Sequence, residues 1–317
     1  MRFLCILLAT LVLSMGAIAQ AYPDRPLRLI VPFPPGGSND IVARVIGAQL
    51  SERLGQTVVI DNRGGAGGTI GINAAAKSAA DGYTLLLASV GYPLSIALGW
   101  MPRESLQWFS AVASLGTGPS LLVVPHSLPA QSLQDLVALA KRKPGSLNAG
   151  AAGPGSFQHL ATELFRLRAG IEIVIIQYKG GGPALTDTIA GQVHMNVGSV
   201  VQNLPQVRAG KLKALGVGGS KRIAALPEVP TFAEAGVPGA EANNWWGLLV
   251  PAGTPAAAIA KLQQEIGAAL ESAETRRRFE LEGAEVMRMG AAQFGELLAA
   301  ETAKWTRVVK EAGIKAE

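Results

Sequence analysis

Three glycine-rich turns carry the residues of this sequence that are best suited to binding chemistry. Each turn follows a short apolar segment and precedes a stretch with helical spacing: residues 34–40 (PPGGSND), 152–157 (AGPGSF) and 179–184 (KGGGPA). A helix start offers free N–H groups and the positive end of the helix dipole, so it favours an anion. Glycine has no Cβ that would hold a ligand away from the backbone. Together the turns predict a site for an anionic group, although glycine at any single turn can also serve turn geometry alone.

The anion is not expected to be a nucleotide. Residues 64–71 (GGAGGTIG) resemble a dinucleotide fingerprint, but counted from Gly65 the third required glycine is Ile70. The chain also has no G-x-x-x-x-G-K-[ST] phosphate loop. Bare N–H donors suit the carboxylate of a small organic acid, and we expect no cofactor.

The residues of enzyme and metal centres lack the spacing that those centres need. None of the three histidines stands in H-E-x-x-H or in a metal-spaced cluster, and no G-x-S-x-G occurs. We expect neither a catalytic residue nor a metal. Asp40 could face a water or a cationic ligand group, or simply favour the helix dipole; His159 could reach the mouth of a cleft, or lie on the surface. A periplasmic hydrolase or isomerase with one of these two as its base is the alternative.

Strands and helices that alternate along the chain position the three turns. The helix after the first turn is expected to be capped by Ser38 or Asn39 and to end at Gly55. Alternation predicts an α/β fold with parallel sheets covered on both faces, whose βα turns gather at the carboxyl ends of the strands. The strand candidates are 27–33, 57–61, 84–88, 120–124, 147–151, 172–177, 193–197, 213–217 and 247–250, and the clearest helices are 133–142, 157–168, 255–271 and 291–312.

The chain is long enough for two lobes. Its 317 residues fit about two domains on a prior of roughly 150 residues each. Two apolar segments that end in proline, 121–125 and 248–251, indicate where the chain crosses between lobes. We expect a first lobe of residues 22–125 plus 246–317 and a second lobe of residues 126–245. A cleft between two such lobes is a common place for a ligand.

Residues 1–21 have the pattern of a cleaved secretion signal. Arg2 precedes an apolar run to about Ile18, which at roughly 16 residues is short of the roughly 20 that span a bilayer. Small residues place the cleavage after Ala19 or Ala21. The only cysteine, Cys5, lies inside this segment, so the exported chain would carry no thiol. These features predict a periplasmic protein.

The composition excludes several classes of protein. Apolar residues make up 49% and charged residues 16% of the chain, which excludes a disordered or disulfide-stapled protein. The formal charge of +5 is modest, and Lys and Arg are scattered along the chain. We therefore expect no nucleic-acid partner.

A series of motifs in a fixed order gives the sequence a family resemblance. Residues 31–40 (VPFPPGGSND) are close to the pattern PFPAGG-x-x-D of the Bug-type receptors, the periplasmic solute-binding proteins of tripartite tricarboxylate transporters. The chain resembles this family from about Tyr22 to Lys315. The other matching segments are 61–68 (DNRGGAGG), 81–86 (DGYTLL), 153–159, 178–180 (YKG), 226–231 (LPEVPT), 251–255 (PAGTP) and 304–315.

The resemblance implies a two-lobed periplasmic-binding-protein fold, similar to type II, whose ligand cleft lies between the lobes. It implies a monomer that closes on a small mono- or dicarboxylate, aromatic acids included, and delivers it to the membrane subunits of the transporter or presents it to a sensor. By matched position it also implies the ligand-binding residues of each lobe. These are Pro35, Gly36, Gly37, Asp40, Ser89 and Val90 in the first lobe and Ala152, Gly153, Gly155, Ser156 and His159 in the second.

Two departures from the family pattern bear on the ligand. Gly198, followed by Ser199, stands where the family commonly has an Asp, and we include both residues in the predicted site. Without that carboxylate an amino-acid ligand is less favoured, and the position is expected to leave room for a bulkier or less polar acid. The usual L-P-Y-D segment near residue 100 reads GWMPRE over residues 99–104.

Overall fold

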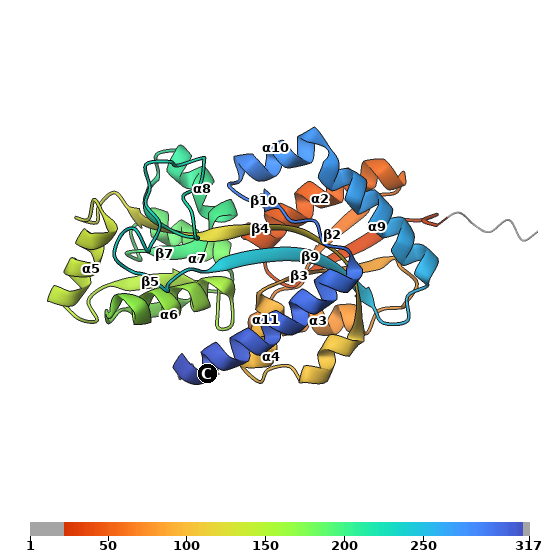
Figure 1. Cartoon of the computed structure of the whole chain (residues 1–317), viewed down its shortest axis with the longest axis horizontal. Coiled ribbons are helices and arrows are strands. Elements are labelled where there is room, and N and C mark those ends of the chain that lie inside the picture. The colour runs from red at the N-terminus through yellow and green to blue at the C-terminus, as the bar shows by residue number, and fades with distance from the viewer. Residues whose placement is uncertain (1–21, 313–317) are drawn as a thin grey trace, which may run out of the picture.

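Two long strands join the two lobes that make up the described part of the chain (Figure 1). They are β4 (Phe109–Pro125) and β9 (Asn243–Pro251). The structure, a computed structural model, describes residues 22–312; the predicted secretion signal at residues 1–21 lies outside the described residues. Within residues 22–312, no helix combines the length and the apolar character that crossing a membrane requires.

The first lobe is built on a mixed sheet with the strand order β10-β4-β9-β3-β1-β2. The strands β1 (Leu27–Val31), β2 (Val58–Asn62) and β3 (Thr84–Ser89) are parallel, as predicted. The strand β9 is antiparallel to both β3 and β4, and β10 (Glu285–Val286) is antiparallel to β4. The prediction of wholly parallel sheets was wrong here, because β4 leaves the first lobe and β9 returns to it in the opposite direction.

Helices cover both faces of this sheet, so its strands are apolar on both sides. Successive residues of β9 enter opposite hydrophobic clusters: Trp245 packs with Phe294 of α11 (Ala291–Ala312), and Trp246 lies in the cluster that contains Ile46 of α2 (Ser38–Leu54). The helices on the α2 side are α9 (Ala256–Glu271) and α10 (Ala273–Leu281), and those on the α11 side are α3 (Thr69–Ala76) and α4 (Gly91–Ala97). Short 3₁₀ turns, η1 (Ala66–Gly68) and η2 (Arg103–Trp108), precede α3 and β4.

The second lobe shares β4 with the first. Residues 120–125 of β4 pair antiparallel with β7 (Asn196–Ser199) and β8 (Leu212–Gly218), and β5 (Asn148–Ala151) pairs parallel with β6 (Val174–Gln177). The segment 121–125, which the sequence analysis assigned to the first lobe, therefore hydrogen-bonds to second-lobe strands. Its proline marks the end of a long strand and not the crossing. The helices of this lobe are α5 (Leu133–Arg142), α6 (Phe157–Ala169), α7 (Gly181–Ile189) and α8 (Val200–Arg208).

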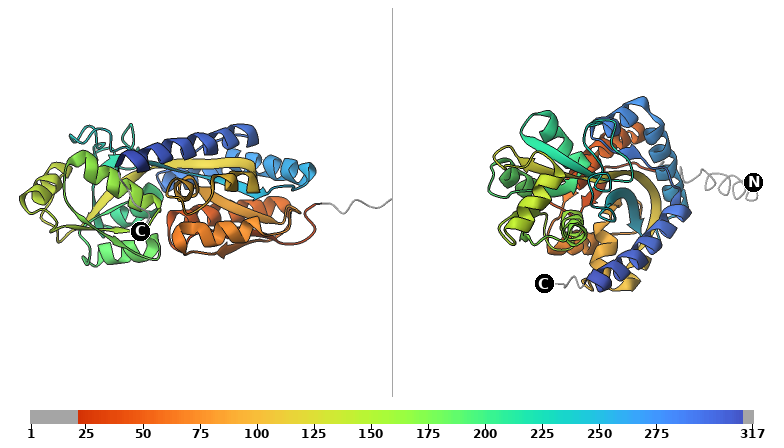
Figure 2. Two further views of the ribbon diagram at one scale, coloured as in Figure 1. Left: turned by 90° about the horizontal axis from the view of Figure 1, so that it is seen from below. Right: turned by 60° about the vertical axis from the view of Figure 1, so that its left-hand side comes forward.

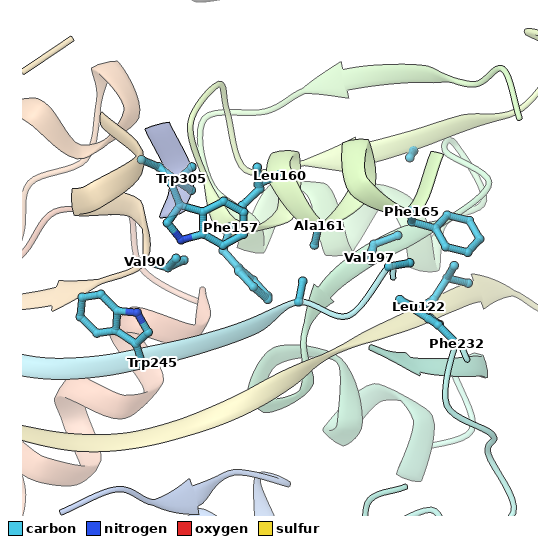
Figure 3. Packing of buried hydrophobic residues seen from close by; sticks show 14 of the residues in the cluster. Val90, Leu122, Phe157, Leu160, Ala161, Phe165, Val197, Phe232, Trp245 and Trp305 are labelled. Carbon is cyan, nitrogen blue, oxygen red and sulfur yellow. The ribbon is translucent and has the colours of Figure 1, made fainter. Parts of the chain in front are cut away.

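A continuous apolar cluster connects the lobes. Figure 2 shows α11 lying along the first lobe with its end near the second. Trp305 of α11 belongs to the same buried cluster as Phe157 at the start of α6, and the cluster continues to Phe165 and Phe232 (Figure 3), whose ring centroids are 5.3 Å apart. The start of α6 is therefore held against the first lobe by packing.

Candidate ligand-binding site

The starts of α2, α6 and α7 meet between the lobes, so the three glycine turns form one site. A Cβ placed on Gly36 would lie 3.8 Å from Cα of Gly182, and one placed on Gly37 would lie 3.9 Å from the backbone nitrogen of Gly181. The first and third turns are thus close to van der Waals contact. Side chains at these positions would fill the space between the lobes, which is a reason for glycine beyond turn geometry.

A small cavity of about 20 Å³ lies where the turns meet. All of its wall residues are uncharged, and they come from both lobes. They are Phe33, Gly37, Ser38, Asn39, Ser89, Ala152, Ser156, Phe157, Gln158, Gly181 and Asn244. The cavity is therefore suited to an anionic group that is held by N–H, amide and hydroxyl donors and not by an ion pair.

The N-terminus of α2 differs from its predicted form. Its N-cap is Gly37, whereas Ser38 and Asn39 lie inside the first turn, and within residues 22–312 no side chain caps this helix start. The prediction of Ser38 or Asn39 as the cap was therefore wrong. Both side chains instead lie in the wall of the small cavity. The predicted end at Gly55 is confirmed, with a left-handed φ of 64°.

The Asn39 side chain is oriented by a tryptophan from β9. Trp246 Nε1 donates to Asn39 Oδ1 at 2.9 Å, and Asn39 Nδ2 donates to Ser89 Oγ at 3.2 Å. Because an indole N–H can only donate, the Asn39 oxygen must face Trp246 and its NH₂ group must face Ser89. All three side chains are buried.

Asp40 shapes the first turn from within. Its carboxylate accepts hydrogen bonds from the Gly36 N–H and from Arg44 Nε, both at 3.0 Å. Burial alone would raise the pKa of Asp40, but the hydrogen bonds from Arg44 and Gly36 outweigh it and hold that pKa below its usual value. Asp40 does not line the small cavity. Its contacts instead stabilise the turn that contains Gly36.

The second-lobe turn is held by side chains of its own helix. Ser156 Oγ accepts from the His159 N–H at 3.1 Å and caps α6, and His159 Nδ1 accepts from the Gly155 N–H at 3.3 Å. Gln158 Nε2 donates to Gln202 Oε1 at 2.7 Å, and Gln202 Nε2 donates to the carbonyl oxygen of Gly181. This chain of amides ties α6 and α8 to the start of α7.

Asn244, at the start of β9, supplies a buried oxygen without a partner. The residue is 1% exposed and lies in the wall of the small cavity. Within residues 22–312, no group donates a hydrogen bond to its Oδ1. A buried amide oxygen normally has a partner, so this one is placed to accept a hydrogen from a bound molecule or water.

A second, larger cavity of about 860 Å³ adjoins the first, since Phe33 and Ala152 lie in both walls. Its wall consists mainly of glycine backbone, prolines and aromatic rings from both lobes. The other wall residues are Pro34, Pro35, Asn62, Gly64, Gly65, Ala66, Gly67, Gly68, Thr69, Trp100, Gly153, Pro154, Tyr178 and Lys179. Most ligand pockets are apolar clefts of about 300–1,000 Å³.

Six of the thirteen predicted site residues line these cavities. Gly37, Ser89, Ala152 and Ser156 line the small cavity, and Pro35, Ala152 and Gly153 line the large one. The others surround them: Gly36 lies against Gly182, Gly155 against the Trp100 ring, and Val90 in the core beside Ser89. His159 lines neither cavity and faces its own turn.

Gly198 does not open the space that the sequence predicted. A Cβ on Gly198 would lie 2.4 Å from Asn196 Oδ1 and 2.9 Å from Asn203 Nδ2. Asn203 Nδ2 also donates to Asn196 Oδ1 at 3.1 Å, so an amide pair occupies this position. The expectation of room for a bulkier acid at Gly198 was wrong. Neither Gly198 nor Ser199 is in the wall of either cavity.

The sequence analysis missed Asn39 as a site residue, together with Asn244, Trp100 and residues 64–68. Residues 64–68 were considered as a nucleotide motif and as part of a segment that carries the family resemblance, but not as part of the site, although their glycines resemble those of the three turns. Asn244 stands in no motif, and Trp100 stands where the sequence departs from the family's L-P-Y-D segment. Both residues come to the site only through the fold.

Comparisons with known proteins point to one family. Residues 42–314 match the family model described as "Tripartite tricarboxylate transporter family receptor". The chain is 41% identical over 313 residues to the protein BugT of Bordetella pertussis, an alignment that covers 98% of this chain and 96% of that protein.

Two solved structures have the same fold. An R. palustris protein with adipate is 38% identical, with a TM-score of 0.89 over 93% of this chain and 99% of that one. The periplasmic binding protein BugD is 30% identical, with a TM-score of 0.88 over 93% of this chain and 100% of that one. The predicted periplasmic-binding-protein fold is confirmed.

Proposed function

Since the chain belongs to the family of tripartite tricarboxylate transporter receptors, we propose that it captures a small organic carboxylate between its lobes and delivers it to the membrane subunits of such a transporter. A receptor of this family binds its ligand without converting it, so the chain is not an enzyme. The alternative of a hydrolase or isomerase is therefore set aside.

The meeting of the α2, α6 and α7 starts at one small cavity is the observation that carries this proposal. Within residues 22–312, no side chain caps α2 or α7, so backbone N–H groups of both first turns are available to an anion. The cavity wall is uncharged and has amide and hydroxyl groups. A carboxylate can accept hydrogen bonds from such donors in both lobes at once.

Contacts to both lobes give the ligand its effect on conformation. The α2 start belongs to the first lobe, and the α6 and α7 starts belong to the second. A ligand that binds all three stabilises the closed arrangement over an open one. The closed form would then be the one that the membrane subunits recognise.

The solved relatives support the ligand class and the compartment. Adipate, the acid in the R. palustris structure, is a dicarboxylate. Since BugD is a periplasmic binding protein, we propose the periplasm for this chain also, with residues 1–21 as the signal that is removed after Ala19 or Ala21. We expect a monomer.

Thermal unfolding in the presence of acids tests the proposal. Ligand at 100 times its dissociation constant should add about 2.7 kcal/mol to the free energy of unfolding. A panel of mono- and dicarboxylates should include acids that raise the midpoint by several degrees, and their amides should not. If no acid, or acid and amide equally, raises the midpoint, the proposal is wrong.

A matched pair of glycine variants ties the binding to the turns. Gly37→Val places a side chain toward Gly181 at a backbone φ of −89°, which a valine can adopt. Gly290→Val adds the same side chain where no atom lies within 4 Å. Gly37→Val should abolish the acid-induced shift, and Gly290→Val should retain it.

A further inference from the structure

We propose that the side-chain N–H of Gln158 binds the ligand carboxylate in the small cavity, and that Gln202 is the positioning residue that orients Gln158. Gln158 makes the contact, whereas Gln202 acts through Gln158 and through the start of α7. The inference rests on the proposed function, which places a carboxylate in the small cavity.

The directions of two hydrogen bonds determine how both amides are oriented. The carbonyl oxygen of Gly181 can only accept, so the NH₂ group of Gln202 must face it. The side-chain oxygen of Gln202 then faces Gln158, and Gln158 Nε2 donates to it at 2.7 Å. The backbone of α7 therefore imposes the orientation of Gln158, whose NH₂ group and not its oxygen points to this end of α7.

The amide nitrogen of Gln158 lies at the wall of the small cavity. A Cβ on Gly181 would lie 2.6 Å from Gln158 Nε2 and 2.6 Å from Gln202 Oε1, so both amides pack directly on the Gly181 backbone. Gly181 and Gln158 both line the cavity. An NH₂ group carries two hydrogens, and the bond to Gln202 uses one of them. The second hydrogen is the one that the bound carboxylate accepts.

The strand β4 fixes the position of Gln202. Asn203, the next residue on α8, donates through Nδ2 to the carbonyl oxygen of Leu121 at 2.8 Å and so anchors α8 to β4. Gln202 is 2% exposed and Asn203 is 0% exposed. The amide pair is thus attached to a strand that both lobes share. A donor that is already ordered loses little conformational entropy when the ligand binds.

A donor of fixed direction distinguishes a carboxylate from the corresponding amide. A carboxylate accepts at both oxygens, whereas a primary amide presents an N–H group in place of one of them. Without Gln202, the side chain of Gln158 could turn its oxygen to the cavity and accept from a ligand amide. Gln202 therefore affects the choice of ligand as well as the strength of binding.

Titration calorimetry on Gln202→Leu tests this role. The probes are adipate, succinate and hexanoate, each beside its amide. Gln202→Leu should weaken the tightest of these acids about tenfold, and the ratio of acid affinity to amide affinity should fall at least about fivefold. Gln206→Leu, one turn further along α8 at a partly exposed residue, is the matched control and should change neither. A role in folding alone would lower the unfolding midpoint of Gln202→Leu and leave the ratio unchanged.

Gln202→Glu adds a test by pH. An ionised carboxylate at this position cannot donate to the Gly181 carbonyl oxygen, but a protonated one can, and burial raises the pKa of the introduced carboxyl group. Relative to wild type at the same pH, the acid affinity of Gln202→Glu should be about tenfold lower at pH 8 and should recover to within about threefold at pH 5.5. Gln206→Glu controls for the added charge and should show no such recovery.

Gln158→Met removes the proposed donor itself and should weaken the acid about tenfold at both pH values. Wild-type affinity in Gln158→Met would overturn the contact. An unchanged acid-to-amide ratio in Gln202→Leu, or a pH-independent loss in Gln202→Glu, would overturn the positioning role. In these cases the inference fails and the proposed function stands. If wild-type protein binds no acid, both fail.

Discussion

Trp246 and Asn39 are 207 residues apart in sequence, and the indole N–H of the first donates to the side-chain oxygen of the second at 2.9 Å. This hydrogen bond joins β9, the strand that returns from the second lobe, to the first turn of α2. It fixes the Asn39 amide so that its NH₂ group faces Ser89. The start of α2 is thereby oriented by the strand that connects the lobes.

Trp246→Phe should therefore weaken both folding and binding. It keeps an aromatic ring but leaves the Asn39 oxygen buried without a donor, which costs about 1–3 kcal/mol. Urea unfolding should show this loss, and calorimetry should show weaker acid binding. Trp245→Phe is the matched control, because its N–H donates to Glu301 on the opposite face of the sheet. Normal acid affinity in Trp246→Phe would show that Asn39 does not need this orientation.

Asn244→Ala should weaken binding with little effect on stability. The Asn244 oxygen is buried without a partner within residues 22–312, so its removal also removes an unfavourable group from the ligand-free protein. Because an amide oxygen and a carboxylate both only accept, Asn244 would act through a water that donates one hydrogen to its Oδ1 and the other to the ligand. Loss of this bridge should lower the affinity about tenfold, and the unfolding free energy should change by less than about 1 kcal/mol. A large loss of stability with unchanged affinity would contradict a role toward the ligand.

Gly155→Ala should disturb the contact between the lobes. Gly155 has a φ of 67°, and a methyl group there would meet the Trp100 ring. Gly170→Ala is the control for backbone strain, since its φ is 61° and no atom lies within 4 Å. Strain alone costs about 1–2 kcal/mol in both variants. Gly155→Ala should lose more stability than Gly170→Ala and should also bind acids more weakly; equal behaviour of the two would contradict the contact.

The low pKa of Asp40 predicts that part of the free energy of unfolding depends on pH. A carboxyl whose folded pKa lies below its ordinary value of 3.8 stabilises the fold above that pH and loses this contribution as the pH falls through the folded pKa. Asp40→Asn should therefore be less stable than wild type at pH 7. Denaturant unfolding from pH 7 to pH 2 should show this difference shrinking below pH 3.8. A difference that is constant across that range would contradict the role of the Asp40 charge.

Local sequence predicted the glycine turns, because a turn that opens a helix needs residues that stand next to one another. The turns at Gly36, Gly153 and Gly181 and the helices after them could be found in this way. The α/β alternation could be found similarly, since strand and helix periodicity are local properties.

Long-range partners could not be predicted from local sequence. Asn39 acquires its role from Trp246, and Trp100 reaches Gly155 only after the lobes pack. The error at Gly198 has the same cause, because the side chain of Asn203 fills the space beside it. The direction of β9 also depends on the whole second lobe lying between it and β4.

A crystal structure of the chain with the tightest-binding acid from the panel tests the central claim most directly. We predict a carboxylate whose oxygens lie within about 2.7–3.2 Å of backbone nitrogens in the turns that open α2 and α7. The acid should contact both lobes and have its remaining atoms toward Trp100. A carboxylate held outside the small cavity, or held by a charged side chain in place of these N–H groups, would contradict the account.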